Sequence, residues 1–323
     1  MSKAGRRIIF FIIVLFGLVV FNYPNIATFV NNLTANREIS EYQESIQEAD
    51  TTWIEHEMEL AYAYNQSLPM SFPADPFSQS NIRSFTGTEF EHFDMVQDGA
   101  VIGYVEVPSI NIYLPVYYGT SDEVLEKGLG LVENTSLPVG GEGTHSVISG
   151  HTGMASRKLF TDLNLVKEGE VFFLHVLDQH FAYKVNQIKV VLPHETQDLI
   201  IERDHDYVTL LTCTPFGIND HRLLVRGERT EWDFTPEKIE HPVVRTLRNP
   251  NEWKWLAALG GAVFVLLIAV LRMIIDSRRE KKKRAAAKKA EAEASAAEAS
   301  AAEASAAEAS MAEADTVEDT KPD

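Results

Sequence analysis

The sequence contains a single cysteine, Cys213, in a setting that favours thiol chemistry. This residue ends an apolar, strand-like run and is followed at once by Thr-Pro-Phe-Gly, which predicts a turn. Arg222 begins the next strand-like run. A strand, a turn and a second strand can bring Arg222 beside Cys213. Because a nearby cation favours the thiolate and can stabilise an oxyanion, the pair indicates nucleophilic acyl chemistry.

An acyl-transfer cysteine also needs a histidine to exchange protons with the thiol and the leaving amine, and the sequence has ten. By spacing, His151 is the best candidate, because it follows the strand-like run 146–150 and opens a glycine-containing loop. His221 competes because it adjoins Arg222, although neighbours in a strand point to opposite faces. His145 is a third candidate. The structural alternative is that Cys213 is a small buried apolar residue and that Arg222 forms a surface ion pair.

The elements that must position these residues are mainly strands. Residues 36–66 have apolar residues at helical spacing and predict one or two helices, whereas prolines and serines over 67–88 predict a loop. Alternating runs rich in Val, Ile and Tyr then predict strands at 101–119, 146–150, 170–177, 181–193, 207–214 and 222–229, with short helices near 121–129 and 157–166. Many short strands with few helices predict an all-β domain that forms a closed or nearly closed barrel.

Both ends of the chain resemble membrane-associated segments. Lys3, Arg6 and Arg7 precede the apolar run 8–21, which predicts a signal peptide or, since no convincing cleavage site follows, an uncleaved anchor. A Trp-flanked apolar run over 253–275 is followed by eight basic residues within 278–289, which predicts a transmembrane helix with a cytoplasmic C-terminus. An Ala/Glu/Ser repeat follows as a low-complexity tail.

Two spans place the middle of the chain outside the cell. There, cysteines normally occur in pairs, so the unpaired Cys213 favours a functional thiol. The net charge of −18 excludes a nucleic-acid-binding protein, which needs a basic face. The sequence shows neither metal-ligand spacing nor a glycine-rich phosphate loop, so we expect no cofactor.

Two motifs identify a resemblance to the sortases, the surface cysteine transpeptidases of bacteria. TLLTCTPFGINDHRLLVRGER (209–229) resembles the family's TLxTC segment with its downstream arginine, and SGHTGM (149–154) resembles the segment around its histidine. The resemblance implies an eight-stranded β-barrel that cleaves LPxTG-type sorting signals between Thr and Gly through a thioacyl-enzyme. It also implies that Cys213 is the nucleophile, that His151 donates a proton to the leaving amine, and that Arg222 orients substrate and stabilises the oxyanion.

A third segment, Asp75-Pro76-Phe77, resembles the lid motif of the class C, pilin-polymerising sortases. By this resemblance Asp75 pairs with Arg222 and Phe77 covers Cys213 as an autoinhibitory lid. The implied partners are pilin subunits that carry an LPxTG-type signal and an acceptor lysine, together with membrane lipid through the two hydrophobic segments. A housekeeping sortase that attaches proteins to cell-wall precursor is the alternative. A non-catalytic scaffold is disfavoured by the motifs, and a papain-like protease by the order His then Cys and by the all-β domain.

The expected fold is therefore all-β, a sortase-like closed eight-stranded barrel with short helices, preceded by a helical arm and a lid loop and flanked by membrane helices. The expected segments are an N-terminal signal or anchor over 1–30, a helical arm over 31–68, a lid loop over 69–90, the catalytic barrel over 91–235, a linker over 236–252, a transmembrane helix over 253–275 and a cytoplasmic tail over 276–323. The enzyme is expected at the cell membrane with its catalytic domain extracellular.

Overall fold

A computed structural model describes residues 3–68, 73–77, 94–97, 99–154, 156–234 and 250–317. The chain divides into two compact units, one formed by residues 1–20 with 255–323 and the other by residues 21–254. The predicted lid loop over 69–90 is described only at 73–77, so the rest of that loop lies outside the described residues.

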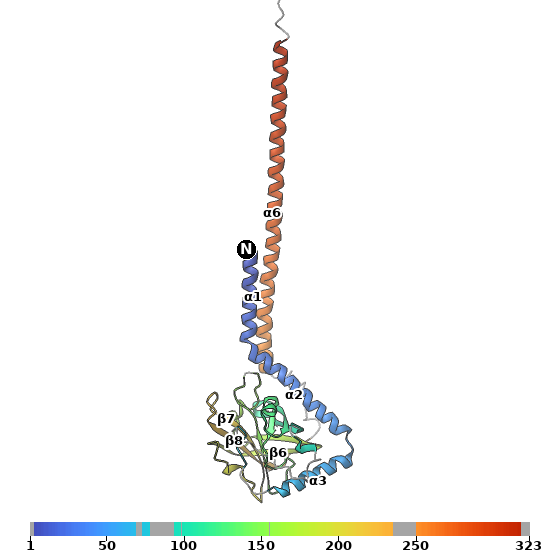
Figure 1. Ribbon diagram of the computed structural model, residues 1–323, viewed down its shortest axis with the longest axis vertical. Coiled ribbons are helices and arrows are strands. Elements are labelled where there is room, and N and C mark those ends of the chain that lie inside the picture. Colours follow the sequence, from blue (N-terminus) through green and yellow to red (C-terminus); the bar gives the residue numbers. More distant parts are fainter. Residues whose placement is uncertain are drawn as a thin grey trace, which may run out of the picture. The chain divides into compact units, whose positions relative to one another are not determined.

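The first unit contains most of α1 (Lys3–Phe21) and of the long α6 (Pro250–Val317), drawn in blue and in orange to red in Figure 1. Phe11 and Leu15 of α1 line an apolar cavity together with Val263 and Leu267 of α6. Helix α6 continues through the basic residues and through the Ala/Glu/Ser repeat of the expected low-complexity tail, because Ala, Glu and Lys all favour helix.

Only one helix among the described residues is long and apolar enough by itself to cross a membrane, the segment Ala257–Ser295 within α6. The N-terminal segment passes the same test only when Ile9–Phe21 is counted together with α2 (Tyr23–Glu48). The structure therefore supports one apolar membrane-length helix where the sequence predicted two, and the N-terminal anchor stays a prediction.

The second unit contains a closed eight-stranded barrel with the strand order β1-β2-β3-β4-β7-β8-β6-β5, which confirms the predicted fold. Strands β6, β7 and β8 are labelled in Figure 1. The strands are β1 (Val101–Val107), β2 (Ile112–Tyr118), β3 (Leu129–Leu131), β4 (Thr144–Ser149), β5 (Val171–Val176), β6 (Gln179–Val191), β7 (Asp206–Thr214) and β8 (His221–Thr230). Neighbours pair antiparallel except for β2 with β3 and β4 with β7. Strand β3 was not predicted, because three residues are too few to show an alternating pattern.

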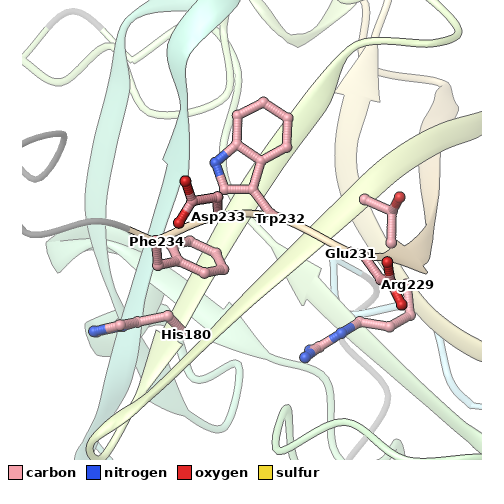
Figure 2. A pocket seen from close by; sticks show the side chains of 7 residues that line it. His180, Arg229, Glu231, Trp232, Asp233 and Phe234 are labelled. Atoms are coloured by element: carbon pink, nitrogen blue, oxygen red, sulfur yellow. The ribbon is translucent and has the colours of Figure 1, made fainter.

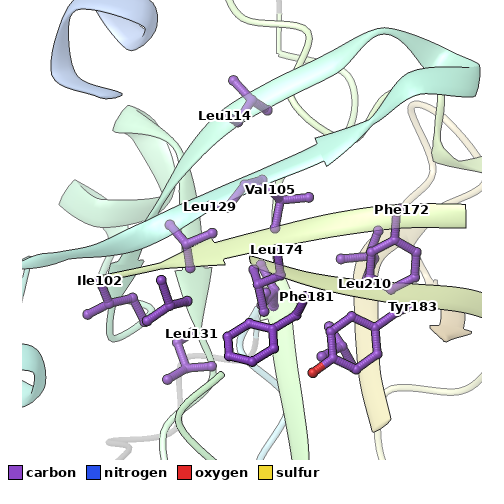
Figure 3. Packing of buried hydrophobic residues seen from close by; sticks show 14 of the residues in the cluster. Ile102, Val105, Leu114, Leu129, Leu131, Phe172, Leu174, Phe181, Tyr183 and Leu210 are labelled. Atoms are coloured by element: carbon purple, nitrogen blue, oxygen red, sulfur yellow. The ribbon is translucent and has the colours of Figure 1, made fainter. Parts of the chain in front are cut away.

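The barrel is closed around a dense apolar core. Alternate residues of its strands point inward, and Val105, Phe172, Leu174 and Leu210 are fully buried there (Figure 3). Short helical segments connect the strands. They are α4 (Asp122–Lys127) and the single turns η3 (Pro108–Ile110), η4 (Leu163–Leu165) and η5 (Gln197–Leu199), with η2 (Asp94–Val96) preceding β1.

Two helices, α2 and α3 (Thr51–Ser67), form the predicted helical arm. Asp50 separates them and caps α3 by accepting a hydrogen bond from the Thr52 amide at 3.0 Å. The side chain of Asn65 fixes α3 to the barrel domain: its Nδ2 donates to the Leu137 carbonyl at 3.0 Å, and its Oδ1 accepts from the Leu137 amide at 2.7 Å. The arm therefore delivers the chain to the segment that carries Asp75.

Candidate active site

The β7–β8 ladder brings the candidate nucleophile and arginine together. Cys213 lies directly opposite Arg222 in the antiparallel register, and Thr214 lies opposite His221. Side chains of opposed residues share one face of a sheet, so Cys213 and Arg222 are neighbours. Both are buried, with 8% and 7% of their surface exposed. The sequence-based expectation of this neighbourhood is confirmed.

His151 follows the end of β4, which runs parallel to β7. Ser149 is in register with Leu211, and the ladder continues because the Gly150 amide donates to the Leu211 carbonyl at 3.0 Å. The Thr212 hydroxyl adds a bond of 2.6 Å to the Gly150 carbonyl. These bonds carry His151 to the strand end where Cys213 lies. This role of Thr212 was not predicted from the sequence. The strand pattern does show that Thr212 precedes Cys213 and faces the opposite side of the strand.

Glycine is required immediately before His151. A Cβ atom at Gly150 would lie 2.6 Å from Leu129 Cδ2 and 2.8 Å from Phe160 Cδ2, which is closer than carbon atoms approach. The chain can therefore pass tightly over the core at this point and release His151 at the barrel end. His151 itself is half-buried.

Residues 73–77 lie over this strand end. Asp75 accepts two hydrogen bonds from Arg222, from Nε at 2.7 Å and from Nη2 at 2.8 Å, in the fork geometry of a bidentate ion pair. The Phe77 ring centroid lies 5.3 Å from the ring of His151 and 5.3 Å from the guanidinium carbon of Arg222. Pro76 between them is buried. Two of the three predicted lid residues, Asp75 and Phe77, thus contact the candidate arginine and histidine directly.

The electrostatics of the site favour uncharged groups. Burial raises the pKa of the Cys213 thiol; Arg222 acts to lower that pKa and Asp75 to raise it. Burial also lowers the pKa of His151, against the opposing effect of the Asp122 and Glu126 carboxylates. When residues 73–77 cover the site, Cys213 and His151 therefore favour the neutral thiol and the neutral imidazole. The neutral thiol is a weaker nucleophile than the thiolate.

The other candidate histidines occupy different environments. His221 points away from Cys213 and its Nδ1 contacts the Asp220 carboxylate at 2.7 Å. His145 is buried between the Ile200 carbonyl and the Thr209 hydroxyl, and burial lowers its pKa to about 4. His221 therefore lies on the strand face opposite to Cys213, as the alternation of side chains in a strand predicted, and His145 has a structural role.

A second concavity follows the end of β8, away from Cys213. Figure 2 shows its lining. The lining residues are His180, Arg229, Thr230, Glu231, Trp232, Asp233 and Phe234. Among these described lining residues there is no thiol, and no hydroxyl donates a hydrogen bond to a base, so the chemistry is better supported at Cys213. Among the described residues, no group of three or more His, Cys, Asp or Glu side chains could hold a metal ion.

Comparison with known proteins agrees with this geometry. A sequence model of the Sortase domain matches residues 105–230. Sortase C of Streptococcus pneumoniae is 44% identical in sequence, with a TM-score of 0.55 over 61% of this chain and 97% of that chain. The chain belongs to the sortase family. The sortase fold and the family predicted from the motifs are thereby confirmed, and the membership supports the predicted enzyme class.

Other solved neighbours of this sortase are also class C enzymes. Clostridium perfringens sortase C, solved with the C-terminal cell wall sorting motif, is 49% identical with a TM-score of 0.52 over 61% of this chain and 99% of that one. The pilus-related sortase C of Group B Streptococcus is 40% identical with a TM-score of 0.55 over 60% of this chain and 97% of that one. Among curated relatives, Sortase A of Bacillus anthracis is 27% identical over 128 residues, which cover 40% of this chain and 59% of that protein.

Proposed function

We propose that this sortase is a class C, pilin-polymerising cysteine transpeptidase that works at the outer face of the cell membrane. The observation that carries the proposal is the strand-end arrangement of Cys213 opposite Arg222, with His151 delivered by the parallel neighbour strand. Residues 73–77 favour class C within the family, because Asp75 and Phe77 engage Arg222 and His151.

The reaction begins when Cys213 Sγ attacks the threonine carbonyl carbon of an LPxTG-type signal and the proton of the thiol passes to the His151 imidazole. The carbonyl electron pair moves to oxygen, and the Arg222 guanidinium stabilises this oxyanion. Collapse of the tetrahedral intermediate breaks the Thr–Gly bond, and His151 gives a proton to the departing glycine amine. The product is a thioester between Cys213 and threonine, with the C-terminal fragment released.

Resolution runs through the same groups in reverse. A neutral lysine Nζ of the next pilin attacks the thioester carbonyl, and the proton it loses returns to the His151 imidazole. The carbon–sulfur bond breaks and an isopeptide bond joins the two pilins. A housekeeping function is the second candidate, favoured by the curated relatives named Sortase A. The two differ only in the amine that resolves the thioester.

Intact-mass spectrometry of the full chain in detergent micelles tests the proposal. We expect LPxTG-type peptides to give a thioacyl adduct on the native protein and none on Cys213→Ala, which removes the nucleophile. An added peptide with a free lysine should then release the adduct as a lysine-linked product. An adduct resolved only by a cell-wall-type amine would indicate the housekeeping function. An adduct on Cys213→Ala would contradict the assignment of the nucleophile.

A further inference from the structure

The Arg222 guanidinium is held from two sides. Its Nε and Nη2 donate to the carboxylate of Asp75 at 2.7 and 2.8 Å. Its Nη1 donates to two backbone carbonyls, those of Asn219 and His221, both at 3.1 Å. The two sets of acceptors engage different nitrogens, so either set can be removed while the other keeps its own donors.

The two anchors differ in how they are attached to Arg222. Asp75 is 147 residues away in the sequence. Asn219 is three residues away, in the loop that connects β7 to β8. That loop is closed by its own hydrogen bonds, from the amides of Ile218 and Asn219 to the Pro215 carbonyl at 3.1 and 3.0 Å. If residues 73–77 move aside, the Asp75 bonds are lost and the loop carbonyls stay in place.

The backbone of Asn219 makes this anchor possible. Its φ of 62° lies in the left-handed region, which asparagine tolerates and which a β-branched residue rarely adopts. The Asn219 side chain is exposed, so the contribution to the site comes from where the backbone turns its carbonyl. Asn219 was not predicted as a site residue from the sequence, although asparagine at the end of the Pro-Phe-Gly-Ile-Asn turn is typical of a left-handed position.

We propose that Asn219 is a positioning residue for Arg222. Its left-handed backbone holds a carbonyl against Nη1, which keeps the Nε/Nη2 edge directed at the reacting carbonyl after Asp75 has withdrawn. This inference rests on the proposed transpeptidase function. The physical reason is preorganisation: an arginine whose side chain is already fixed loses less conformational freedom when it binds the oxyanion.

The test uses the full chain in detergent with Asp75→Ala as the parent, since there Arg222 has lost the carboxylate on Nε and Nη2 and keeps the backbone carbonyls on Nη1. Asn219→Gly keeps the left-handed conformation, whereas Asn219→Val is strained in it and Asn219→Ala is intermediate. Single-turnover formation of the thioacyl adduct with LPxTG-type peptides is followed by intact mass across peptide concentrations. We expect Asn219→Val to lower the maximal rate by about 10-fold to 10²-fold, as displaced catalytic groups do. Asn219→Gly should stay within about threefold of the parent, because the carbonyl keeps its place.

Asn134→Val provides the matched control. Asn134 also has a φ of 62°. It lies beside the other end of the barrel, because the Ser136 amide donates to the His145 carbonyl near the start of β4. We expect this variant to lose thermal stability, since it introduces the same backbone strain, and to keep the parent's acylation rate. Alkylation of Cys213 by iodoacetamide, measured at a pH where the thiol is fully ionised, should match the Asp75→Ala parent in the Asn219 and Asn134 variants, because none of these substitutions changes access to the thiol.

The outcomes separate the inference from the proposed function. Equal maximal rates for Asn219→Val and Asn219→Gly would overturn the positioning role, as would an equal loss in Asn134→Val. An effect on the half-saturating peptide concentration alone would also overturn it, because it would indicate a contact with bound peptide. If the Asp75→Ala parent forms no adduct with any peptide, the proposed transpeptidase function itself fails, and this inference with it.

Discussion

The strands that carry the candidate catalytic residues and the segment that covers them are held in different ways. Strands β7 and β8 are joined by a continuous ladder from Tyr207–Glu228 to Thr214–His221, so Cys213 and Arg222 are placed by backbone pairing. Residues 73–77 reach the same site through side chains, chiefly the Asp75 ion pair and the Phe77 ring. A single substitution can therefore release the cover and leave the catalytic geometry intact.

The chemistry of the two regions differs as well. Facing each other across the ladder, a thiol and a guanidinium form a site that can act on a carbonyl. The covering segment supplies a carboxylate to that guanidinium, which occupies the Nε/Nη2 edge that an oxyanion would use. The covering segment is in this respect a stand-in for substrate, and its removal should change accessibility and charge while the barrel stays folded.

The largest expected effect in this comparison comes from the barrel side. Arg222→Ala should lower thioacyl formation by roughly 10²–10³-fold, the usual loss when an oxyanion donor is removed. Intact-mass kinetics with an LPxTG-type peptide measure the rate. Arg226→Ala is the control, because Arg226 lies on the same strand but stacks on Tyr207, with its guanidinium carbon 4.2 Å from that ring centroid. Equal losses in the two variants would mean that Arg222 acts only through strand stability.

A smaller effect is expected when the cover is weakened. Phe77→Ala removes the ring that packs on His151 and Arg222. Because this ring excludes reagent from the closed site, iodoacetamide should alkylate Cys213 about tenfold faster in the variant. A tenfold change corresponds to about 1.4 kcal/mol in the equilibrium between the closed and open states. Phe173→Ala is the matched control, because Phe173 is also half-buried but packs against Trp232 and Phe234. Unchanged labelling of Phe77→Ala would contradict a lid.

The most subtle difference is in charge. Burial raises the pKa of Cys213 and Asp75 adds to that rise, so Asp75→Asn should lower the pKa of the thiol. More thiolate is then present at a given pH, and the alkylation rate profile should move to lower pH. Asp220→Asn, at an exposed carboxylate beside His221, should leave the profile in place. A profile that moves to higher pH in Asp75→Asn would contradict the assigned sign.

Some contacts of this site were predictable from the sequence and others were not. The pairing of Cys213 with Arg222 was predicted from the local sequence, because a strand, a turn and a second strand bring residues that are close in the sequence side by side. The choice of His151 among the histidines was left open by spacing and was completed by the resemblance to sortases. Its neighbourhood with Cys213 depends on a parallel ladder between strands that are far apart in the sequence, which local patterns do not encode.

The sequence predicted a membrane segment at each end of the chain. Among the described residues, one helix is by itself long and apolar enough to cross a membrane, and it lies at the C-terminal end. The C-terminal repeat was expected as a low-complexity tail in which Ala and Glu favour helix, and helix α6 runs through it. The roles of Asp75, Pro76 and Phe77 came only from the family resemblance, since a short Asp-Pro-Phe motif has no intrinsic partner.

The amino-acid sequence by itself determined the elements of this protein: the alternating strands, the turn after Cys213, the apolar helix and the family. These depend on residues that are close together, for which side-chain pattern and backbone preference are sufficient. The pairing of Asp75 with Arg222 was implied only by the family resemblance, and tertiary structure alone decided that the Asn219 carbonyl holds Nη1 of the same guanidinium. Such contacts depend on barrel closure and on the backbone angle of a single loop residue, because a hydrogen bond forms only when its donor and acceptor are brought to within about 3 Å in the right direction.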